Sequence, residues 1–549
     1  MKRIPILALI LCVCFVSVSW SQLAAGKGEF HRRDMMRWNP HEKVLNVDSV
    51  NGTGFISGSA LHWNGSPSAT HLISDSRLIA AMLTPDITTA DIASAKHFRH
   101  VLVLVQENRT PDNLFHALCG PQLILCPSPY DLQSFGFNST GKKVLLKKSR
   151  LGSHNDPLHD HPDFVALCDF DPQTQQCKMD GADKIPCHSE SAKGNQPGGG
   201  LSTAQSRNAP NCSFEYVDPS DIQPYLTLVQ QYGYANYMFS TSQGGSFPGH
   251  QFLFSGTSAP SAADDEAGFF SDKHMPWHAE VGCFAEKTTY VTLITPNGYR
   301  KAKPCFEHNT IPDILPSNVS WRYYASARRA GMWVAPNAIK HICQPDKRYG
   351  GKCVGPEWVN NVDFSSRDVF TDIANCNLRS LSWVIPSGEN SDHPGGKPAN
   401  GPSWIASIVN AIGTNTTCDK TGYWEDTAII VTWDDFGGFY DHVPPPILPM
   451  PQGDFQLGPR VPLLFVSAYT PINYIDNNQQ DYGSILRFVE QNWGIQEGAL
   501  NFADARATND LTTFFNLNQQ PRAFVPIPAP KDANYFLNDK TPPTDPDDD

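Results

Sequence analysis

The chain of 549 residues carries 42 Lys and Arg against 55 Asp and Glu, which gives a formal net charge of −13. Hydrophobic residues make up 40% and charged residues 18%, so there is enough apolar material for a large core, and a globally disordered chain is excluded. The negative balance argues against a protein that binds nucleic acid through a basic surface, and no nucleic-acid partner is expected.

The first residues resemble an export signal. Lys2 and Arg3 precede an apolar run over residues 4–18, and small residues follow. This pattern is typical of a secretory signal peptide, here residues 1–21, and the run is short for a membrane span, although an uncleaved anchor is the alternative. No later stretch approaches about 18 uninterrupted apolar residues. We therefore expect a secreted or periplasmic protein without stable membrane insertion.

Cysteine usage agrees with export. Two of the 14 cysteines lie in the predicted signal peptide, and the other twelve are an even number. In an exported chain such a set indicates disulfide bonds, and the zinc alternative lacks any Cys-x-x-Cys pair. Close spacing favours four pairs: Cys119–Cys126, Cys168–Cys177, Cys283–Cys305 and Cys343–Cys353.

Short apolar runs alternate with helical patterns along the chain. In chain order, we expect a short helix at 91–98, a strand at 100–106, a helix at 218–239, a strand at 381–385, a helix at 404–412, strands at 427–433 and 461–467, and a helix at 483–493. Runs that are apolar on both faces are typical of buried parallel strands. Their alternation with helices predicts an α/β fold with a mostly parallel central sheet.

Composition suggests how the chain is organised. Residues 22–95 are polar and without a strong period, and are interpreted as an N-terminal extension. The main domain is placed at 96–525, with insertions near 121–215 and 260–310 that hold most of the Cys, Pro, Gly and Asn. The tail at 526–549 is rich in Pro and Asp, and its end is expected to be disordered.

Polar side chains follow two of the predicted strands. Glu107 and Asn108 come after the first strand, and Asp434 and Asp435 come after 427–433. In open α/β sheets ligands bind at the carboxyl ends of the strands. Adjacent carboxylates are unfavourable together unless a cation lies between them, and oxygen donors favour Mg, Ca or Mn. The alternative is a solvated turn before two glycines.

A serine and several histidines lie in similar loops. Ser246 follows two glycines that allow the backbone to approach a ligand, and a serine hydroxyl beside a metal can become a nucleophile. An ordinary Gly/Ser turn is the alternative. Histidines in polar loops are candidates for contacting a phosphoryl oxygen or protonating a leaving group; the candidates are His159, His161, His393 and His442.

Seven motifs together resemble a known family of secreted phosphoesterases, which contains bacterial and plant non-specific phospholipases C and related bacterial acid phosphatases. In order along residues 101–471 they read VLVLVQENRTPDNLF, HDHPDF before KMDGA, QGGSFPGHQFLFSGTS, HNTIPDILPSNVSWRYYA, LSWVIPSGENSDHPG, WEDTAIIVTWDDFGGFYDHVPPP and GPRVPLLFVSAYTP. The resemblance implies the alkaline-phosphatase-like architecture: a three-layer α/β fold with a mostly parallel sheet, helices on both faces and disulfide-closed insertions.

The resemblance also implies a site. One divalent metal ion, which is Mg, Ca, Mn or Zn, would be held by Glu107, Asn108, Ser246, Asp434 and Asp435. Ser246 would attack phosphorus and form a phosphoseryl intermediate. His159 and His393 would contact the transferred phosphoryl group with the help of Asn108, and His393 would protonate the leaving oxygen. No further cofactor is implied.

The substrate is less sharply indicated. The resemblance implies a phosphate-ester substrate, possibly a phospholipid. The acidic pair continues as Phe436-Gly437-Gly438, which is similar to the phosphatase form rather than to the phospholipase form with His in this place. A broad phosphomonoesterase without lipid activity is therefore an alternative, and a non-catalytic secreted binding protein on the same fold is another. The oligomeric state cannot be predicted from the sequence.

Overall fold

A computed structural model of the chain divides it into two units, Met1–Lys96 and His97–Asp549. In the first unit the structure describes strand segments alone. In the second it describes residues 97–119, 129–189, 211–259, 266–269, 281–285, 289–295, 298–325, 331–346, 351–395, 398–419, 422–450 and 454–544.

The first unit contains a five-stranded antiparallel sheet in the order β1-β5-β4-β3-β2. Its strands are β1 (Lys2–Pro5), β2 (Met36–Asn39), β3 (Val44–Val47), β4 (Gly52–Ser57) and β5 (Ala60–Asn64). Most of the predicted signal peptide lies outside the described residues, so the signal peptide stays a prediction. The short helix predicted at 91–98 also lies outside them, except for its last two residues, which are not helical.

The second unit is built on an eight-stranded sheet in the order β22-β19-β23-β6-β24-β27-β15-β28. Its strands are β6 (His100–Gln106), β15 (Gly233–Phe239), β19 (Trp321–Tyr324), β22 (Val362–Asp363), β23 (Leu381–Val384), β24 (Thr427–Trp433), β27 (Leu463–Ser467) and β28 (Tyr474–Asp481). Neighbouring strands are parallel except at β27, which is antiparallel to β24 and β15. The predicted α/β class with a mostly parallel sheet is confirmed.

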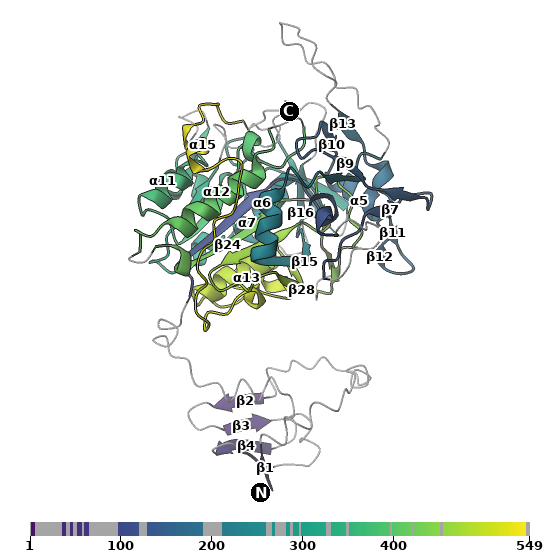
Figure 1. The fold of residues 1–549 in the computed structure, drawn as a ribbon. Helices are drawn as coiled ribbons and strands as arrows, with labels where there is room; N and C mark the ends of the chain where they lie inside the picture. Colours follow the sequence, from purple (N-terminus) through teal and green to yellow (C-terminus); the bar gives the residue numbers. More distant parts are fainter. Residues whose placement is uncertain are drawn as a thin grey trace. The chain divides into compact units, whose positions relative to one another are not determined.

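Helices cover this sheet on both sides, and Figure 1 shows them packed around it. The main helices are α6 (Gln223–Gln231), α7 (Ser246–Ser255), α11 (Asp368–Ala374), α12 (Gly401–Thr414), α13 (Tyr482–Asn492) and α15 (Ala533–Asn538). Every residue of β6 and β24 is buried, as a sheet covered on both faces requires. Within the described part of the chain, no helix combines the length and apolar character needed to cross a membrane.

Two tryptophans show that α6 and α7 lie on opposite faces. The Trp383 indole donates a hydrogen bond to a main-chain carbonyl of α7 (3.1 Å), and the Trp433 ring packs against Tyr225 of α6 with ring centroids 5.4 Å apart. In the strand register, Trp383 lies beside Val103 and Trp433 beside Gln106. These two positions of β6 are separated by an odd number of residues, so they point to opposite faces.

One predicted element is wrong in its second half. The helix predicted at 218–239 ends with α6, and the chain continues as strand β15. A side chain at Gly233 would lie 2.5 Å from the Phe514 ring, and β15 pairs with β27 and β28, which come more than 200 residues later. Local spacing cannot reveal pairing of that range. The other predictions from 100 onward match β6, β23, α12, β24, β27 and α13.

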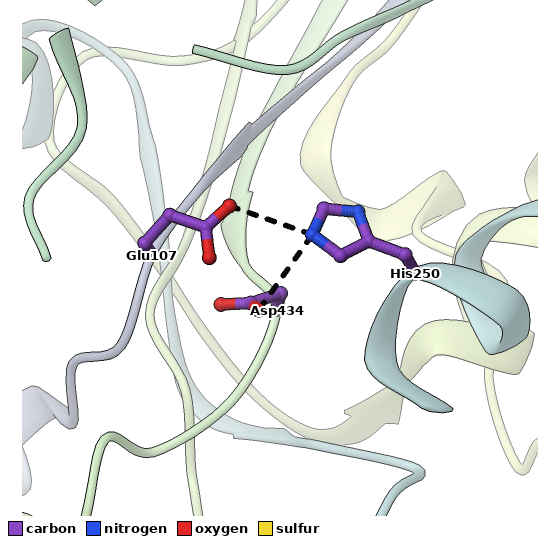
Figure 2. A group of neighbouring side chains, drawn as sticks. All are labelled: Glu107, His250 and Asp434. Carbon is purple, nitrogen blue, oxygen red and sulfur yellow. Dashed lines mark ion pairs between the residues drawn. The ribbon is translucent and has the colours of Figure 1, made fainter. Parts of the chain in front are cut away.

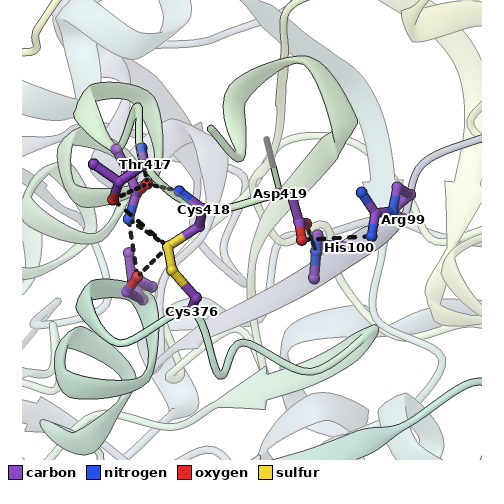
Figure 3. The surroundings of a disulfide bond; sticks show 8 residues. Arg99, His100, Cys376, Thr417, Cys418 and Asp419 are labelled. Carbon is purple, nitrogen blue, oxygen red and sulfur yellow. Dashed lines mark hydrogen bonds and ion pairs between the residues drawn. A yellow bond between two sulfur atoms is a disulfide. The ribbon is translucent and has the colours of Figure 1, made fainter. Parts of the chain in front are cut away.

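Disulfide bonds close several loops. Three predicted pairs are confirmed, and Cys119 is also bonded, while Cys126 lies outside the described residues. Two further pairs, Cys187–Cys212 and Cys376–Cys418, were not predicted. Figure 3 shows Cys418 next to Asp419, whose carboxylate binds His100 at 2.7 Å. The Cys376–Cys418 disulfide therefore holds Asp419 in place, and Asp419 in turn binds His100, the first residue of β6.

The first insertion packs against the sheet end that carries the acidic pair. Its elements are β7 (Phe135–Phe137), β8 (Lys143–Leu145), β9 (Lys147–Ser149), β10 (Asn155–Pro157), α5 (His161–Cys168), β11 (Phe170–Asp171), β12 (Gln176–Cys177), β13 (Cys187–Ser189) and β14 (Glu215–Val217). Its apolar core includes Phe164 and Phe214, which cluster with Phe436 and Tyr440. Hydrophobic contact thus holds the insertion directly beside the loop after β24.

The second insertion forms a small sheet of its own, and the tail contributes Phe536 to the main core. The insertion contains β16 (Glu266–Phe269), β17 (Val291–Thr295) and β18 (Gly298–Ala302), which form a three-stranded antiparallel sheet. The tail is described as far as Thr544, whose hydroxyl donates to Glu389 at 2.9 Å. The predicted disorder at its end concerns residues 545–549, which lie outside the described residues.

Candidate metal centre and active site

The two predicted acidic and polar pairs meet at one edge of the sheet. Glu107 and Asn108 follow β6, Asp434 and Asp435 follow the neighbouring strand β24, and all four side chains are fully buried. The Asn108 N–H donates to Asp434 Oδ1 at 3.2 Å. Asn108 has a φ of 60°, a left-handed conformation that Asn tolerates better than most residues and that is frequent at functional sites.

Ser246, which lies at the end of the loop after β15, is close to the acidic pair Asp434 and Asp435. It is the first residue of α7, and its hydroxyl donates to Asp435 Oδ2 at 3.3 Å. Gly245, with a φ of 75°, makes the turn into the helix. A Cβ at Gly249 would lie 2.3 Å from the carbonyl oxygen of Asp434, so only glycine lets α7 pack this closely against the acidic pair.

His250, which was not predicted from the sequence, forms a group of potential metal ligands together with Glu107 and Asp434. Its Nε2 lies 3.4 Å from Glu107 Oε1 and 3.6 Å from Asp434 Oδ2, and the donor atoms of the three residues all lie within 4.8 Å of one another. Figure 2 shows the imidazole pointing from its helix toward both carboxylates. The spacing of four residues between Ser246 and His250 places both on one side of α7, and this signal could have identified His250.

The electrostatics of this group call for a cation. Burial, together with the nearby charges of Asp435 and Glu107, raises the pKa of Asp434 well above its usual value. Asp434 Oδ2 and Asn108 Oδ1 make no hydrogen bond within the described residues. Buried carboxylates this close are unfavourable without positive charge, so the donor set fits a divalent ion. The imidazole adds a nitrogen donor to the expected oxygens, which suits zinc better than Mg or Ca.

Both predicted catalytic histidines lie at the site. His159 Nδ1 donates to the Pro157 carbonyl at 2.9 Å, which leaves Nε2 to accept from the Asn108 amide at 3.1 Å. The same Nε2 lies 4.0 Å from Asp435 Oδ2. His393 lies across from it, with ring centroids 6.1 Å apart, although the two residues come from the first insertion and from the loop after β23.

A main-chain contact ties the insertion to the serine loop. The Gly245 N–H donates to the His159 carbonyl at 2.9 Å, so the residues before Ser246 and the loop that carries His159 are held together. Ser246, Asp435, Asn108 and His159 therefore form one continuous polar cluster beside the group Glu107, His250 and Asp434.

Two other candidate histidines have different surroundings. His161 packs against Phe164 and Tyr299, and burial lowers its pKa to about 4. His442 contacts Asp112 at 2.8 Å and Asp131 at 3.1 Å. Arg460, also buried, binds Asp441 at 2.8 Å beside it. Asp112, Asp441 and His442 could geometrically hold a metal among the described residues, but these ion pairs already balance their charges.

His442 gives a prediction about stability and pH. Burial opposes its charge, but Asp112 and Asp131 outweigh burial and raise the pKa of His442 to about 10. Because the pKa of His442 is higher in the folded than in the unfolded state, its protonation stabilises the folded protein. This stabilisation is fully present below the unfolded pKa of about 6.5 and is lost as the pH rises through 10. We expect His442→Gln to lower the free energy of unfolding by about 3 kcal/mol at pH 6 and by much less above pH 10.

Urea unfolding of both proteins at pH 6 and at pH 10.5 measures this difference. His154→Gln is the matched control, because His154 is exposed, and it should change the free energy of unfolding little at either pH. An equal effect of His442→Gln at the two pH values would show that His442 is not charged in the folded protein.

Comparison with known proteins adds independent information. A family model described as the phosphoesterase family matches residues 98–496. The chain is 23% identical to a non-hemolytic phospholipase C of Pseudomonas aeruginosa, covering 83% of this chain and 64% of that protein. It is 22% identical to a non-hemolytic phospholipase C of Burkholderia pseudomallei, covering 79% and 62%. The chain thus spans less than two thirds of the length of these relatives.

A plant relative and a solved structure are more distant. The chain is 26% identical to non-specific phospholipase C1 of Arabidopsis thaliana over 26% of this chain and 29% of that protein. A protein in the alkaline phosphatase superfamily from Vibrio parahaemolyticus aligns with 13% identity and a TM-score of 0.30, covering 53% of this chain and 64% of that one. This score is too low to support a structural argument.

Proposed function

Since the chain belongs to the phosphoesterase family, we propose that it is a secreted hydrolase of phosphoric esters that requires one divalent metal ion and acts through Ser246. The observation that carries the proposal is the meeting of a buried serine hydroxyl, a group of metal-ligating side chains and two histidines at one edge of the sheet. A phosphoryl group needs such a combination, because its negative oxygens repel a nucleophile.

The metal would be held by Glu107, Asp434 and His250, with Asn108, Asp435 and Ser246 next to them. When bound, the ion would supply positive charge that neutralises the phosphoryl oxygens and lowers the pKa of a nearby hydroxyl. These residues of the site are buried, and a low local dielectric strengthens the electrostatic interactions among them.

Ser246 is proposed as the nucleophile. Its hydroxyl oxygen forms a bond to phosphorus while the bond from phosphorus to the leaving oxygen breaks. Asp435 Oδ2, which accepts the hydroxyl hydrogen bond, is placed to receive the proton. The Asn108 amide can donate to the transferred oxygens, and His159, whose Nε2 lies 4.0 Å from Asp435, would do so with a proton on Nε2.

His393 is proposed to donate a proton to the leaving oxygen. Its Nδ1 donates a hydrogen bond to the Pro394 carbonyl at 2.8 Å, so Nε2 is the nitrogen that would carry the proton for the leaving oxygen. Water then attacks phosphorus while the bond from phosphorus to the Ser246 oxygen breaks, which releases the phosphate or the phosphorylated head group. Asp435 returns its proton to the serine oxygen, and a proton of the water goes to His393, so both residues recover their starting states.

The natural substrate has two candidates. The phospholipase C names of the relatives favour a phospholipid. The buried Phe436 after the acidic pair, which is similar to the phosphatase form of the motif, favours a soluble phosphomonoester. The two differ in whether the product that carries phosphate is inorganic phosphate or a phosphorylated alcohol.

A parallel assay tests the proposal. We expect the purified protein to hydrolyse either 4-nitrophenyl phosphate or phosphatidylcholine vesicles, and to lose that activity after treatment with a chelator and regain it when metal is restored. Zinc and Mg should be compared in the restoration step, because His250 favours zinc. No hydrolysis of either substrate by metal-loaded protein would refute the proposed function.

A further inference from the structure

A buried carboxylate without a role in the proposed reaction lies directly before His393. The side chain of Asp392 is fully buried, and its Oδ2 accepts a hydrogen bond from the Tyr225 hydroxyl at 2.8 Å and one from the Trp433 indole at 3.1 Å. Oδ1 makes no hydrogen bond within the described part of the chain. The two donors come from α6 and from the last residue of β24, so this one carboxylate joins a helix to the sheet.

The main chain of Asp392 is held just as firmly. Its N–H donates to the side-chain oxygen of Gln106 at 3.0 Å, and its carbonyl accepts from Arg109 Nε at 3.0 Å and from Arg109 Nη2. Arg109 is fully buried, and it also donates to the Leu151 carbonyl of the first insertion. Asp392 therefore connects the loop after β23 with both ends of the Glu107–Asn108 pair.

Three of the four hydrogen-bond partners of Asp392, all except Tyr225, are adjacent in sequence to a residue of the site. The neighbouring pairs are Gln106 and Glu107, Arg109 and Asn108, Trp433 and Asp434, and Asp392 and His393. The network thus forms a layer beneath the site that joins the carboxyl ends of β6, β23 and β24.

The surroundings of Asp392 leave little freedom. A Cβ at Gly401, the first residue of α12, would lie 1.9 Å from Asp392 Oδ1, so a larger residue would displace the carboxylate. Burial raises the pKa of Asp392 to about 7, against the opposing effects of Arg109, Tyr225 and Trp433. A buried side chain with two hydrogen bonds moves little, so the position of Asp392 restricts the main-chain position of the next residue, His393.

The main-chain hydrogen bonds of Asp392 hold the main chain directly before His393. Two hydrogen bonds of His393 lie within its own loop: its main-chain N–H donates to Ser391 at 3.0 Å, and its Nδ1 donates to the Pro394 carbonyl. The Nδ1 bond orients the ring within the loop, whereas the bonds of Asp392 position the loop relative to β6 and β24. We propose that Asp392 is a positioning residue that holds His393 where it can protonate the leaving oxygen, an inference that rests on the proposed function.

Dependence on the leaving group distinguishes this role from a general structural one. A 4-nitrophenolate leaves readily without a proton, whereas an alkoxide needs one, so a misplaced proton donor slows hydrolysis of an alkyl phosphate more. We expect Asp392→Ala to lower turnover of an alkyl phosphate about 10²-fold and turnover of 4-nitrophenyl phosphate less than about tenfold, with metal content unchanged. Asp392→Asn keeps an acceptor for Tyr225 and Trp433 and should restore the wild-type ratio of the two rates.

A double-mutant cycle with His393→Ala completes the test. If Asp392 acts through His393, replacing Asp392 in the His393→Ala protein causes no further loss that is selective for the alkyl phosphate. Equal losses on both substrates, or a selective loss that persists without His393, would overturn the assignment. If Asp392→Ala does not fold, Tyr225→Phe removes one of the two hydrogen bonds and should show the same selectivity in weaker form. A wild type that hydrolyses neither ester would instead refute the proposed function itself.

Discussion

Ser246→Ala should fold, bind metal and lose nearly all hydrolysis, by at least about 10³-fold. The substitution removes the oxygen that would attack phosphorus, while Glu107, His250 and Asp434 remain in place to hold the ion. Ser246 is only the first residue of α7, so the helix itself does not depend on the hydroxyl. Turnover and metal content of the purified variant are the quantities to measure.

A covalent intermediate provides the second half of this test. Acid quenching of the wild type with labelled substrate, followed by peptide mapping, should place the label on the peptide that contains Ser246. Ser255→Ala is the matched control, since Ser255 is the last residue of the same helix and its hydroxyl binds main-chain carbonyls of Gln251 and Thr257. A mild loss in Ser246→Ala without any labelled peptide would favour direct attack by water, with Ser246 as a ligand only.

Glu107→Ala and Asp434→Ala should each remove bound metal and lower turnover by at least about 10²-fold. Both carboxylates are fully buried and lie within reach of His250 Nε2, so losing either leaves the ion with one charged donor fewer. Metal analysis of the purified variants measures the loss directly. The same experiment on His250→Ala tests the ligand that the sequence did not reveal.

A second group of similar composition is the control for this prediction. Asp313, His341 and Glu357 also lie close enough to hold a metal, but two of the three are exposed, and Glu307 and Asp313 already bind both ring nitrogens of His341. Asp313→Ala should therefore leave metal content and turnover near the wild-type values. Full metal occupancy in both Glu107→Ala and Asp434→Ala, together with normal rates, would refute the proposed metal centre.

The acidic and polar pairs could be found from sequence because their signal is local. The run at 100–106 is apolar at every position but its ends, the run at 427–433 contains only threonine besides apolar residues, and the polar residues that follow them mark where each strand stops. Parallel strands present their carboxyl ends at one edge, so the two pairs were expected to meet there. The hydrogen bond from Asn108 to Asp434 shows that they do.

Histidines show the limit of such reasoning. His159 and His393 were proposed from their polar loops and from the family resemblance, and both lie at the site. His442 has the same kind of loop but forms an ion pair with Asp112 instead. His250 lies in an apolar helix, where a histidine is ordinarily part of the core. Which of these rings meets the acidic pair depends on contacts between elements, which leave no local pattern.

The sequence predicted the α/β class, four of the eight strands of the main sheet, the acidic and polar residues that follow two of them, and three disulfides between nearby cysteines, because each leaves a pattern within a few residues. Only the tertiary structure revealed that β15 is a strand, that His250 lies beside the acidic pair and that Asp392 is hydrogen-bonded to the ends of β6 and β24. These features arise from pairing and packing between segments that lie far apart in the sequence. Such contacts become favourable only when the whole sheet has formed, so neither the spacing nor the composition of a short segment encodes them.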